Sequence, residues 1–327
     1  MSRALLAGQV LILCCVQATA GAAEFSWDLS GAASEASAGN LQDTNGSALA
    51  ATYYFDSVDD SQGPYGLAVF LDPASRLSLG ISRTKQTTHS LGIFSPSDLT
   101  TTSDDYTIGG QYWLSASKWY AGGDYTTSDI DLPFSSGTLV STQDSKAYHV
   151  FAGKYLGPKT SLELGFRRSV REFGQVVNLC PPPTVCPNGG IVDIDSKTTT
   201  DEAGVSFVHV RRFRNLPYSL FGSVVETSGH FTTDASEPLL GLVGHFKPFW
   251  TWAVGAEAFP STKLGVRFRY TRADYDGAHG DSYDVAATWF LKRNMALELA
   301  WTRSQSHFDF ASTPNVDTIS LRFIGRL

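Results

Sequence analysis

The chain has 327 residues and a formal net charge of −7 at pH 7, from 32 acidic and 25 basic side chains. This acidic balance argues against a nucleic-acid partner, because nucleic-acid-binding surfaces are basic. After residue 23 no apolar run approaches the roughly 18 residues that a membrane-spanning helix needs; the longest is YGLAVFL at 65–71. These properties leave a soluble domain or a membrane β-barrel.

The first 23 residues read as a secretory signal peptide. Arg3 supplies a short positive start, residues 10–16 an apolar middle, and small residues between 18 and 22 place cleavage between 20 and 23. Removing this segment takes away one base and no acid, so the formal net charge changes from −7 to −8. We expect the protein to be exported, with residues 24–327 as one folded domain.

Short turn signals recur along the rest of the chain, and each is flanked by two β-rich runs of about ten residues. Longer connections rich in Ser, Thr, Asp and Gly alternate with them, which is typical of outer-membrane barrels. The six turns lie at residues 72–75, 115–118, 157–160, 214–217, 260–263 and 292–294. With both termini on the short-turn side, six turns give 2 × (6 + 1) strands.

The prediction is therefore an all-β fold: a single transmembrane, antiparallel, up-and-down β-barrel of about 14 strands, with 12–16 allowed. Its short turns would be periplasmic and its long loops extracellular. A soluble sandwich also alternates apolar and polar residues, but here aromatic residues crowd the short turns. We expect them to form the girdle at a lipid–water boundary: Trp113, Trp119, Tyr120, Tyr155, Tyr218, Phe259, Trp289 and Phe290.

The segment ATYYFDSVDDSQGPYGLAVFLDPASRLSLG, residues 51–80, carries a Tyr-Tyr-Phe-Asp run, a Gly-Pro pair and a Phe-Leu-x-x-Ala-Ser run. It resembles the general porin family of Gram-negative outer-membrane β-barrels. The resemblance implies an outer-membrane pore without assigned catalytic residues. Within the segment, Pro64 to Leu71 is either a helical plug at the periplasmic end or a short strand, because periodicity does not resolve so short an apolar run.

The chain ends in VDTISLRFIGRL, whose apolar residues alternate up to Leu327. This resembles the terminal strand that the barrel-assembly machinery of Gram-negative bacteria reads. Most such strands end in an aromatic residue, and here Leu327 stands in that place. The expected surroundings are outer-membrane lipid and lipopolysaccharide.

Charged residues recur on the face opposite the apolar rows, about three to six residues from the short turns. Near the periplasmic side they would form a belt on the lumen wall. One interpretation is a constriction that filters solutes by charge, and the other is a ladder of cross-strand ion pairs; both can hold together. The belt comprises Asp28, Glu163, Arg167, Glu257, Arg267, Arg269, Asp284, Glu298 and Arg322.

The longest loop contains Cys180 and Cys186, which suit a loop disulfide in an oxidising compartment. The loop is then either a stapled lid or, as we favour, a protease-resistant surface loop. We expect no metal site and no cofactor: Asp274, Asp276 and Asp281 lack the full ligand spacing of a calcium loop. Seven further acids fall in the predicted long loops: Asp104, Asp105, Asp129, Asp131, Asp193, Asp195 and Asp234.

The leading functional hypothesis is a channel for passive diffusion of small hydrophilic solutes. The alternative is a non-conducting barrel with a structural or adhesive role through its extracellular loops. An enzyme is not expected, since no Ser-His-Asp order, HExxH or Gly-x-Ser-x-Gly occurs. His149 and His209 are the only mid-strand histidines that an outer-membrane hydrolase could use. Whether barrels associate into oligomers is left open.

Overall fold

The computed structural model describes residues 24–39, 42–61, 63–89, 98–133, 140–178, 191–235, 242–308, 311–312 and 315–327. The predicted signal peptide, residues 1–23, and the cysteine pair, Cys180 and Cys186, lie outside the described residues. No helix in the described part of the chain is long and apolar enough to cross a membrane.

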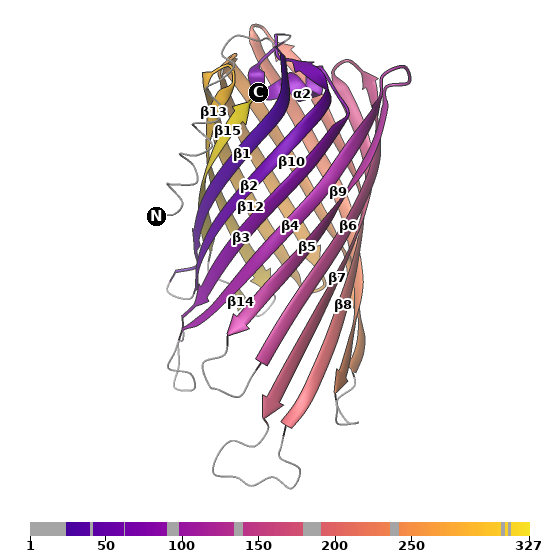
Figure 1. The fold of residues 1–327 in the computed structure, drawn as a ribbon, viewed down its shortest axis with the longest axis vertical. Coiled ribbons are helices and arrows are strands. Elements are labelled where there is room, and N and C mark those ends of the chain that lie inside the picture. The colour runs from indigo at the N-terminus through magenta and orange to yellow at the C-terminus, as the bar shows by residue number, and fades with distance from the viewer. Residues whose placement is uncertain are drawn as a thin grey trace.

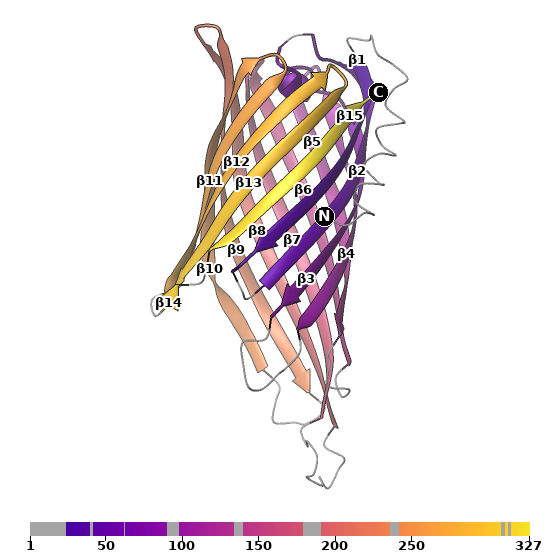
Figure 2. The same ribbon diagram turned by 90° about the vertical axis from the view of Figure 1, so that its left-hand side faces the viewer.

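Fourteen antiparallel strands of the described chain close into a barrel (Figure 1). Each strand pairs with its neighbour in the chain, and β1 pairs with β15, which closes the ring (Figure 2). The strands are β1 (Glu24–Ser37), β2 (Gln42–Asp59), β3 (Arg76–Thr88), β4 (Leu99–Leu114), β5 (Trp119–Pro133), β6 (Val140–Gly157), β7 (Thr160–Asn178), β8 (Ile191–Phe213), β9 (Leu216–Ala235), β10 (Leu242–Ser261), β11 (Leu264–Tyr275), β12 (Ala278–Lys292), β13 (Met295–Phe308) and β15 (Val316–Arg326). A two-residue piece, β14 (Ala311–Ser312), pairs only with the end of β13. The predicted architecture and strand number are confirmed.

The predicted short turns all lie at the end of the barrel that holds the C-terminus and the start of β1 (Figure 1). Five of them are tight connections, and the sixth, at 72–75, ends a longer connection between β2 and β3. That connection carries a 3-10 turn, η2 (Tyr65–Leu67), and a one-turn helix, α2 (Ala68–Leu71). A further tight turn joins β11 to β12 at the opposite end, where Gly277 adopts a φ of 71° that favours glycine.

The strands are longer than the ten residues expected, ranging from 11 in β15 to 23 in β8. They project unevenly beyond the end opposite the C-terminus and the start of β1 (Figure 2). The acids predicted in long loops therefore lie in strands: Asp104 and Asp105 in β4, for example, and Asp129 and Asp131 in β5. Polar Ser, Thr and Asp residues continue the ladder there, because backbone pairing needs no apolar face once the sheet leaves the lipid.

The outer face is an apolar band bounded by ion pairs. On β3, Leu77, Leu79 and Ile81 are 43%, 53% and 52% exposed, and so wide an apolar surface marks a contact with lipid. The next outward residue, Arg83, binds Asp104 with Nε 2.6 Å from Oδ1. The same change from apolar row to ion pair occurs on other strand pairs, at Arg168–Asp201 (2.6 Å) and Arg303–Asp317 (2.8 Å).

Candidate functional site

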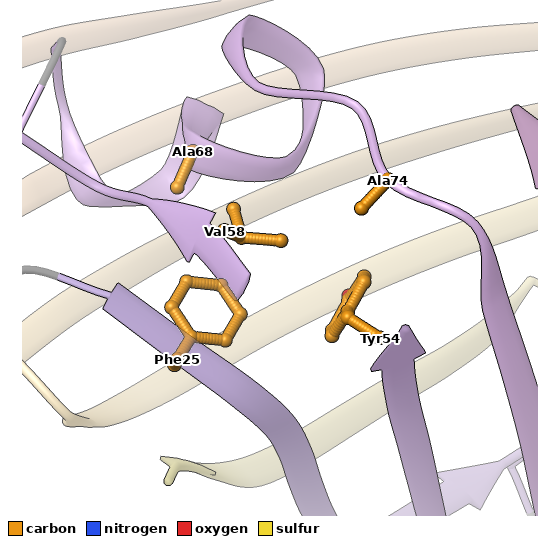
Figure 3. Close-up of a cluster of buried hydrophobic side chains, with 5 residues drawn as sticks. All are labelled: Phe25, Tyr54, Val58, Ala68 and Ala74. Atoms are coloured by element: carbon orange, nitrogen blue, oxygen red, sulfur yellow. The ribbon is translucent and has the colours of Figure 1, made fainter. Parts of the chain in front are cut away.

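The connection between β2 and β3 folds into the short-turn end of the barrel and forms a plug, defined here as residues 63–75. Its helix α2 packs Ala68 beside Val58, which is fully buried (Figure 3). Phe25 and Tyr54 complete this cluster from β1 and β2, with their rings 5.6 Å apart and perpendicular. The helical interpretation of residues 64–71 is confirmed, and the strand interpretation is wrong.

The plug also reaches strands far from its own. Leu67, 6% exposed, packs against Val210 of β8 and Phe259 of β10. Gly66 makes this approach close, because a Cβ at that position would lie 2.9 Å from the Phe259 ring. Phe70 lies 5.2 Å from the ring of Tyr155 on β6. The plug therefore contacts several sides of the barrel wall at its periplasmic end.

Backbone groups of the plug are tied to the wall at Tyr65. Its N–H donates to the carbonyl of Thr262 at 3.2 Å, and its carbonyl accepts from Arg326 Nη1 at 2.8 Å. The Arg326 guanidinium also lies over the rings of Phe25 and Phe290, at 4.6 and 5.1 Å. A buried cation held between two aromatic faces and a carbonyl joins the last strand to the plug.

Two acids, one before the plug and one within it, fix the ends of the connection between β2 and β3. Asp60, which is buried, pairs with Arg293 in the β12–β13 turn. That hydrogen bond raises the pKa of Arg293, whose guanidinium is charged at physiological pH in any environment. Asp72 Oδ2 accepts the backbone N–H of Asp59 at 2.7 Å. The two ends of the connection are thus adjacent, although the segment between them extends across the barrel.

Some residues of the predicted aromatic girdle face the interior of the barrel, on the side of the plug, and others face outward. Trp119 and Trp289 are 45% and 57% exposed on the outer face, as expected. Their chain neighbours Tyr120 and Phe290 are 7% and 3% exposed, because adjacent residues of a strand face opposite sides. Phe259 is likewise buried at 2%. For these three residues the girdle prediction is wrong, because they pack on the inner side of the wall. It is also wrong for Trp113 and Tyr155, whose rings lie 5.2 Å apart beside Tyr120 and the plug residue Phe70.

One part of the predicted charged belt is a hydrogen-bonded network on β11, β12 and β13. Arg267 Nε lies 3.2 Å from Asp284 Oδ1, and its Nη1 lies 4.0 Å from Glu298 Oε2. Thr302 donates to Asp284 at 3.1 Å, and Thr288 donates to Glu298 at 2.8 Å. The acids on this wall are therefore satisfied by one arginine and two hydroxyls, as in an ion-pair ladder.

The other belt residues on this side are less engaged. Arg269 is exposed on the inner face and has no ion-pair partner among the described residues. Arg322 is also exposed and donates to Ser30 Oγ at 3.2 Å. Glu257 is the register partner of Arg267, and Asp28 lies 3.9 Å from Arg326. Among the described residues of this wall, Arg269 and Arg322 are thus the belt arginines that form no ion pair.

Glu163 and Arg167 lie on β7, on another part of the wall. They line a hollow of about 380 Å³ together with Asp124, His149 and Glu202. His149 Nδ1 is 2.9 Å from Asp124 Oδ2. The sequence analysis missed Asp124 and Glu202, although each alternates with outward-facing residues on its strand. Their proximity to His149 and Arg167 depends on the register of β5 to β8, which the sequence does not show.

His209 has an ordinary strand environment. Its Nδ1 lies 2.8 Å from the hydroxyl of Thr160, its register partner on β7. The two mid-strand histidines, His149 and His209, therefore stand on different strands with different partners.

At the extracellular end, His89 lies just after β3 between two carboxylates. Its Nε2 is 3.2 Å from Asp43 Oδ2, and its Nδ1 is 3.1 Å from Asp98 Oδ2. These hydrogen bonds raise the pKa of His89 above its ordinary value of 6.5. Its contribution to stability is therefore complete below that value and is lost as the pH rises through the folded-state pKa.

We accordingly expect His89→Asn to lower the melting temperature more at about pH 5.5 than at about pH 8.5. Thermal melts of both proteins in the same detergent at the two pH values measure this. An equal difference at both would contradict the charged interaction.

Sequence and structure comparisons agree with this architecture. Residues 111–290, more than half of the chain, match the family model described as outer membrane protein beta-barrel domain. No curated protein matches the chain by sequence. Among solved structures, the chain is similar to the outer membrane protein Omp33 of Acinetobacter baumannii, with a TM-score of 0.53 and 15% identity over 94% of this chain and 100% of that one.

The toluene transporter TodX of Pseudomonas putida is a second similar structure, with a TM-score of 0.51 and 10% identity over 93% of this chain and 90% of that one. At these identities the likeness concerns the fold. The family match, the closed 14-strand barrel and its apolar outer band together identify the chain as a member of the outer-membrane β-barrel protein family.

Proposed function

We propose that the protein is an outer-membrane channel for passive diffusion of small hydrophilic solutes, narrowed at its periplasmic mouth by the plug. The observation that carries the proposal is the character of the inner wall. Arg269, Arg322, Glu163, Arg167 and Glu202 face a hollow interior instead of an apolar core. Charged side chains at such positions are stable when water fills the lumen.

The distribution of charge along the wall supports a preference among solutes. Arg269 and Arg322 form no ion pair with the described residues, whereas the β5–β8 side holds Asp124, Glu163 and Glu202 against Arg167 and His149. Opposite charges on separated parts of a narrow lumen create a transverse field. This field would orient dipolar hydrophilic solutes. It would attract anions toward the arginine side and cations toward the acidic side.

The plug also favours one alternative: a barrel that does not conduct and acts through its extracellular loops. Its apolar contacts with Val210 and Phe259, the hydrogen bond from Arg326 and the Arg293 guanidinium over the Tyr65 ring hold it firmly at the periplasmic mouth. A segment held this tightly reduces the free cross-section. The two functions differ in whether water and solute still pass beside the plug.

Flux through proteoliposomes tests the proposal. Residues 24–327, folded in detergent and inserted in liposomes, should admit uncharged sugars at rates that fall steeply from pentose to trisaccharide. Liposomes with heat-denatured protein are the control. Pentose influx no faster than in that control would reject the channel and leave the loop-based role. Using residues 24–327 also rests on our inference that residues 1–23 are a cleaved signal peptide.

A further inference from the structure

Two histidines and one aspartate meet on the outer face of the barrel, beyond the apolar band. His279 and His307 are register partners on β12 and β13, and their rings are stacked 4.6 Å apart at 12°. Asp281 is two residues from His279 and therefore shares its face. The Asp281 side chain reaches outward, since its Oδ1 accepts from the hydroxyl of Tyr270, whose ring lies beside exposed Tyr283.

The three donor atoms converge without bonding one another. Asp281 Oδ2 lies 3.7 Å from His279 Nε2 and 3.9 Å from His307 Nδ1, too long for hydrogen bonds. His307 Nδ1 is buried and has no hydrogen-bond partner. A nitrogen lone pair or N–H that is shielded from water and unsatisfied costs stability unless a ligand satisfies it.

We propose that His279, Asp281 and His307 bind a divalent transition-metal ion of the zinc type. Their ligand atoms all lie within 4.8 Å of one another. Donors of a tetrahedral zinc ion at about 2.0–2.1 Å stand about 3.3 Å apart, so small side-chain rotations bring these atoms into place. Two imidazoles and one carboxylate match zinc, and the fourth position would be filled from the solvent side.

The surrounding groups support this assignment. Tyr270 holds Asp281 Oδ1 at 2.5 Å, which orients Oδ2 toward the histidines as outer-shell partners of metal ligands do. Arg272 lies 4.0 Å from Asp281, but its Nε is engaged by Asp274 at 2.8 Å. The formal charges of Arg272, Asp274 and Asp281 sum to −1, so the site attracts a cation.

The geometry also separates Asp274, Asp276 and Asp281, the three neighbouring acids whose sequence spacing does not match a calcium loop. Asp274 pairs with Arg272, and Asp276 in the β11–β12 turn pairs with Lys247. Only Asp281 remains directed at the histidines. A hard cation such as Ca²⁺ needs six to eight oxygen ligands, which this arrangement does not supply.

Calorimetric titration of the folded, untagged barrel with Zn²⁺ tests the site. We expect one saturable ion per chain, with affinity lowered more than about tenfold by His279→Ala or His307→Ala, and about tenfold by Tyr270→Phe. Co²⁺ should produce visible absorption bands in the wild type that both histidine variants lose. His230 and His245 form a second cross-strand histidine pair, with rings 6.1 Å apart, and His245→Ala is the matched control that should leave binding unchanged.

Heat-modifiable migration in gels establishes that each variant is folded before titration. Zn²⁺ isotherms that are the same for the wild type and the His279→Ala/His307→Ala double variant would overturn the assignment. So would the absence of saturable Zn²⁺ binding, or competition by an equal concentration of Ca²⁺, which would indicate only an acidic surface.

Discussion

Deleting Tyr65–Leu71 is expected to raise the unitary conductance of the barrel severalfold. The deletion removes the 3-10 turn and the helix, and with them Leu67 from its contacts with Val210 and Phe259. The shortened connection can close, because Asp72 is already hydrogen-bonded to the backbone of Asp59. Single-channel recording in planar bilayers measures the change.

A point substitution separates the plug from general damage to the barrel. Arg326→Met removes the hydrogen bond to the Tyr65 carbonyl and should increase the frequency of large openings. Arg322→Met, on the same strand and the same face, contacts Ser30 and not the plug, so it should leave opening frequency unchanged. A deletion variant with wild-type conductance would show that the plug does not limit passage.

Replacing inner-wall arginines by glutamine should shift the reversal potential in a salt gradient toward cations. The shift should persist at high salt, because charges in a narrow lumen are screened less than charges at an exposed mouth. Arg269→Gln should change selectivity alone, since Arg269 has no ion-pair partner among the described residues. Arg267→Gln should also destabilise the barrel, by about 1 kcal/mol, since Asp284 loses its partner at 3.2 Å.

The pair of variants distinguishes the two interpretations of the charged belt. If Arg269→Gln keeps wild-type selectivity and Arg267→Gln only lowers the melting temperature, the arginines have a structural role and the charge-filter hypothesis is wrong. Reversal potentials at two salt concentrations, with thermal melts of the same preparations, supply both measurements.

The barrel was predictable because its signals are local. Each tight turn, such as 115–118 or 293–294, is encoded within a few residues, and strand number follows from counting turns. The lengths of the strands were not predictable. Backbone pairing continues after the apolar band ends, through polar sequence such as that around Asp104. Hydrophobic alternation reports where the lipid lies and says nothing about where the backbone pairing stops.

The inner site could not be predicted from the sequence, because it is formed by contacts between distant segments. Tyr120 and Phe290 look like girdle residues until a plug is present to give the inner face an apolar partner. Arg326 looks like one more inward rung of the last strand, although its role depends on Tyr65, 261 residues earlier. The plug helix is one turn long, and such a short run carries no periodicity that identifies it.

The histidine cluster could not be predicted from the sequence, because it is formed by the register between β12 and β13. His279 and His307 are 28 positions apart in the sequence, and only the pairing of β12 with β13 makes them neighbours. In the sequence, Asp281 grouped more naturally with Asp274 and Asp276. Its position two residues from His279 on the same face decides its partners instead.

Single-channel recording of the wild-type barrel tests the central claim most directly. If the charged inner wall lines a water-filled path beside the plug, the folded protein will give stable unitary current steps in symmetric potassium chloride, smaller than those of the Tyr65–Leu71 deletion. Silence from both proteins, each inserted and heat-modifiable in gels, would contradict the account and assign the barrel a role that does not involve its lumen.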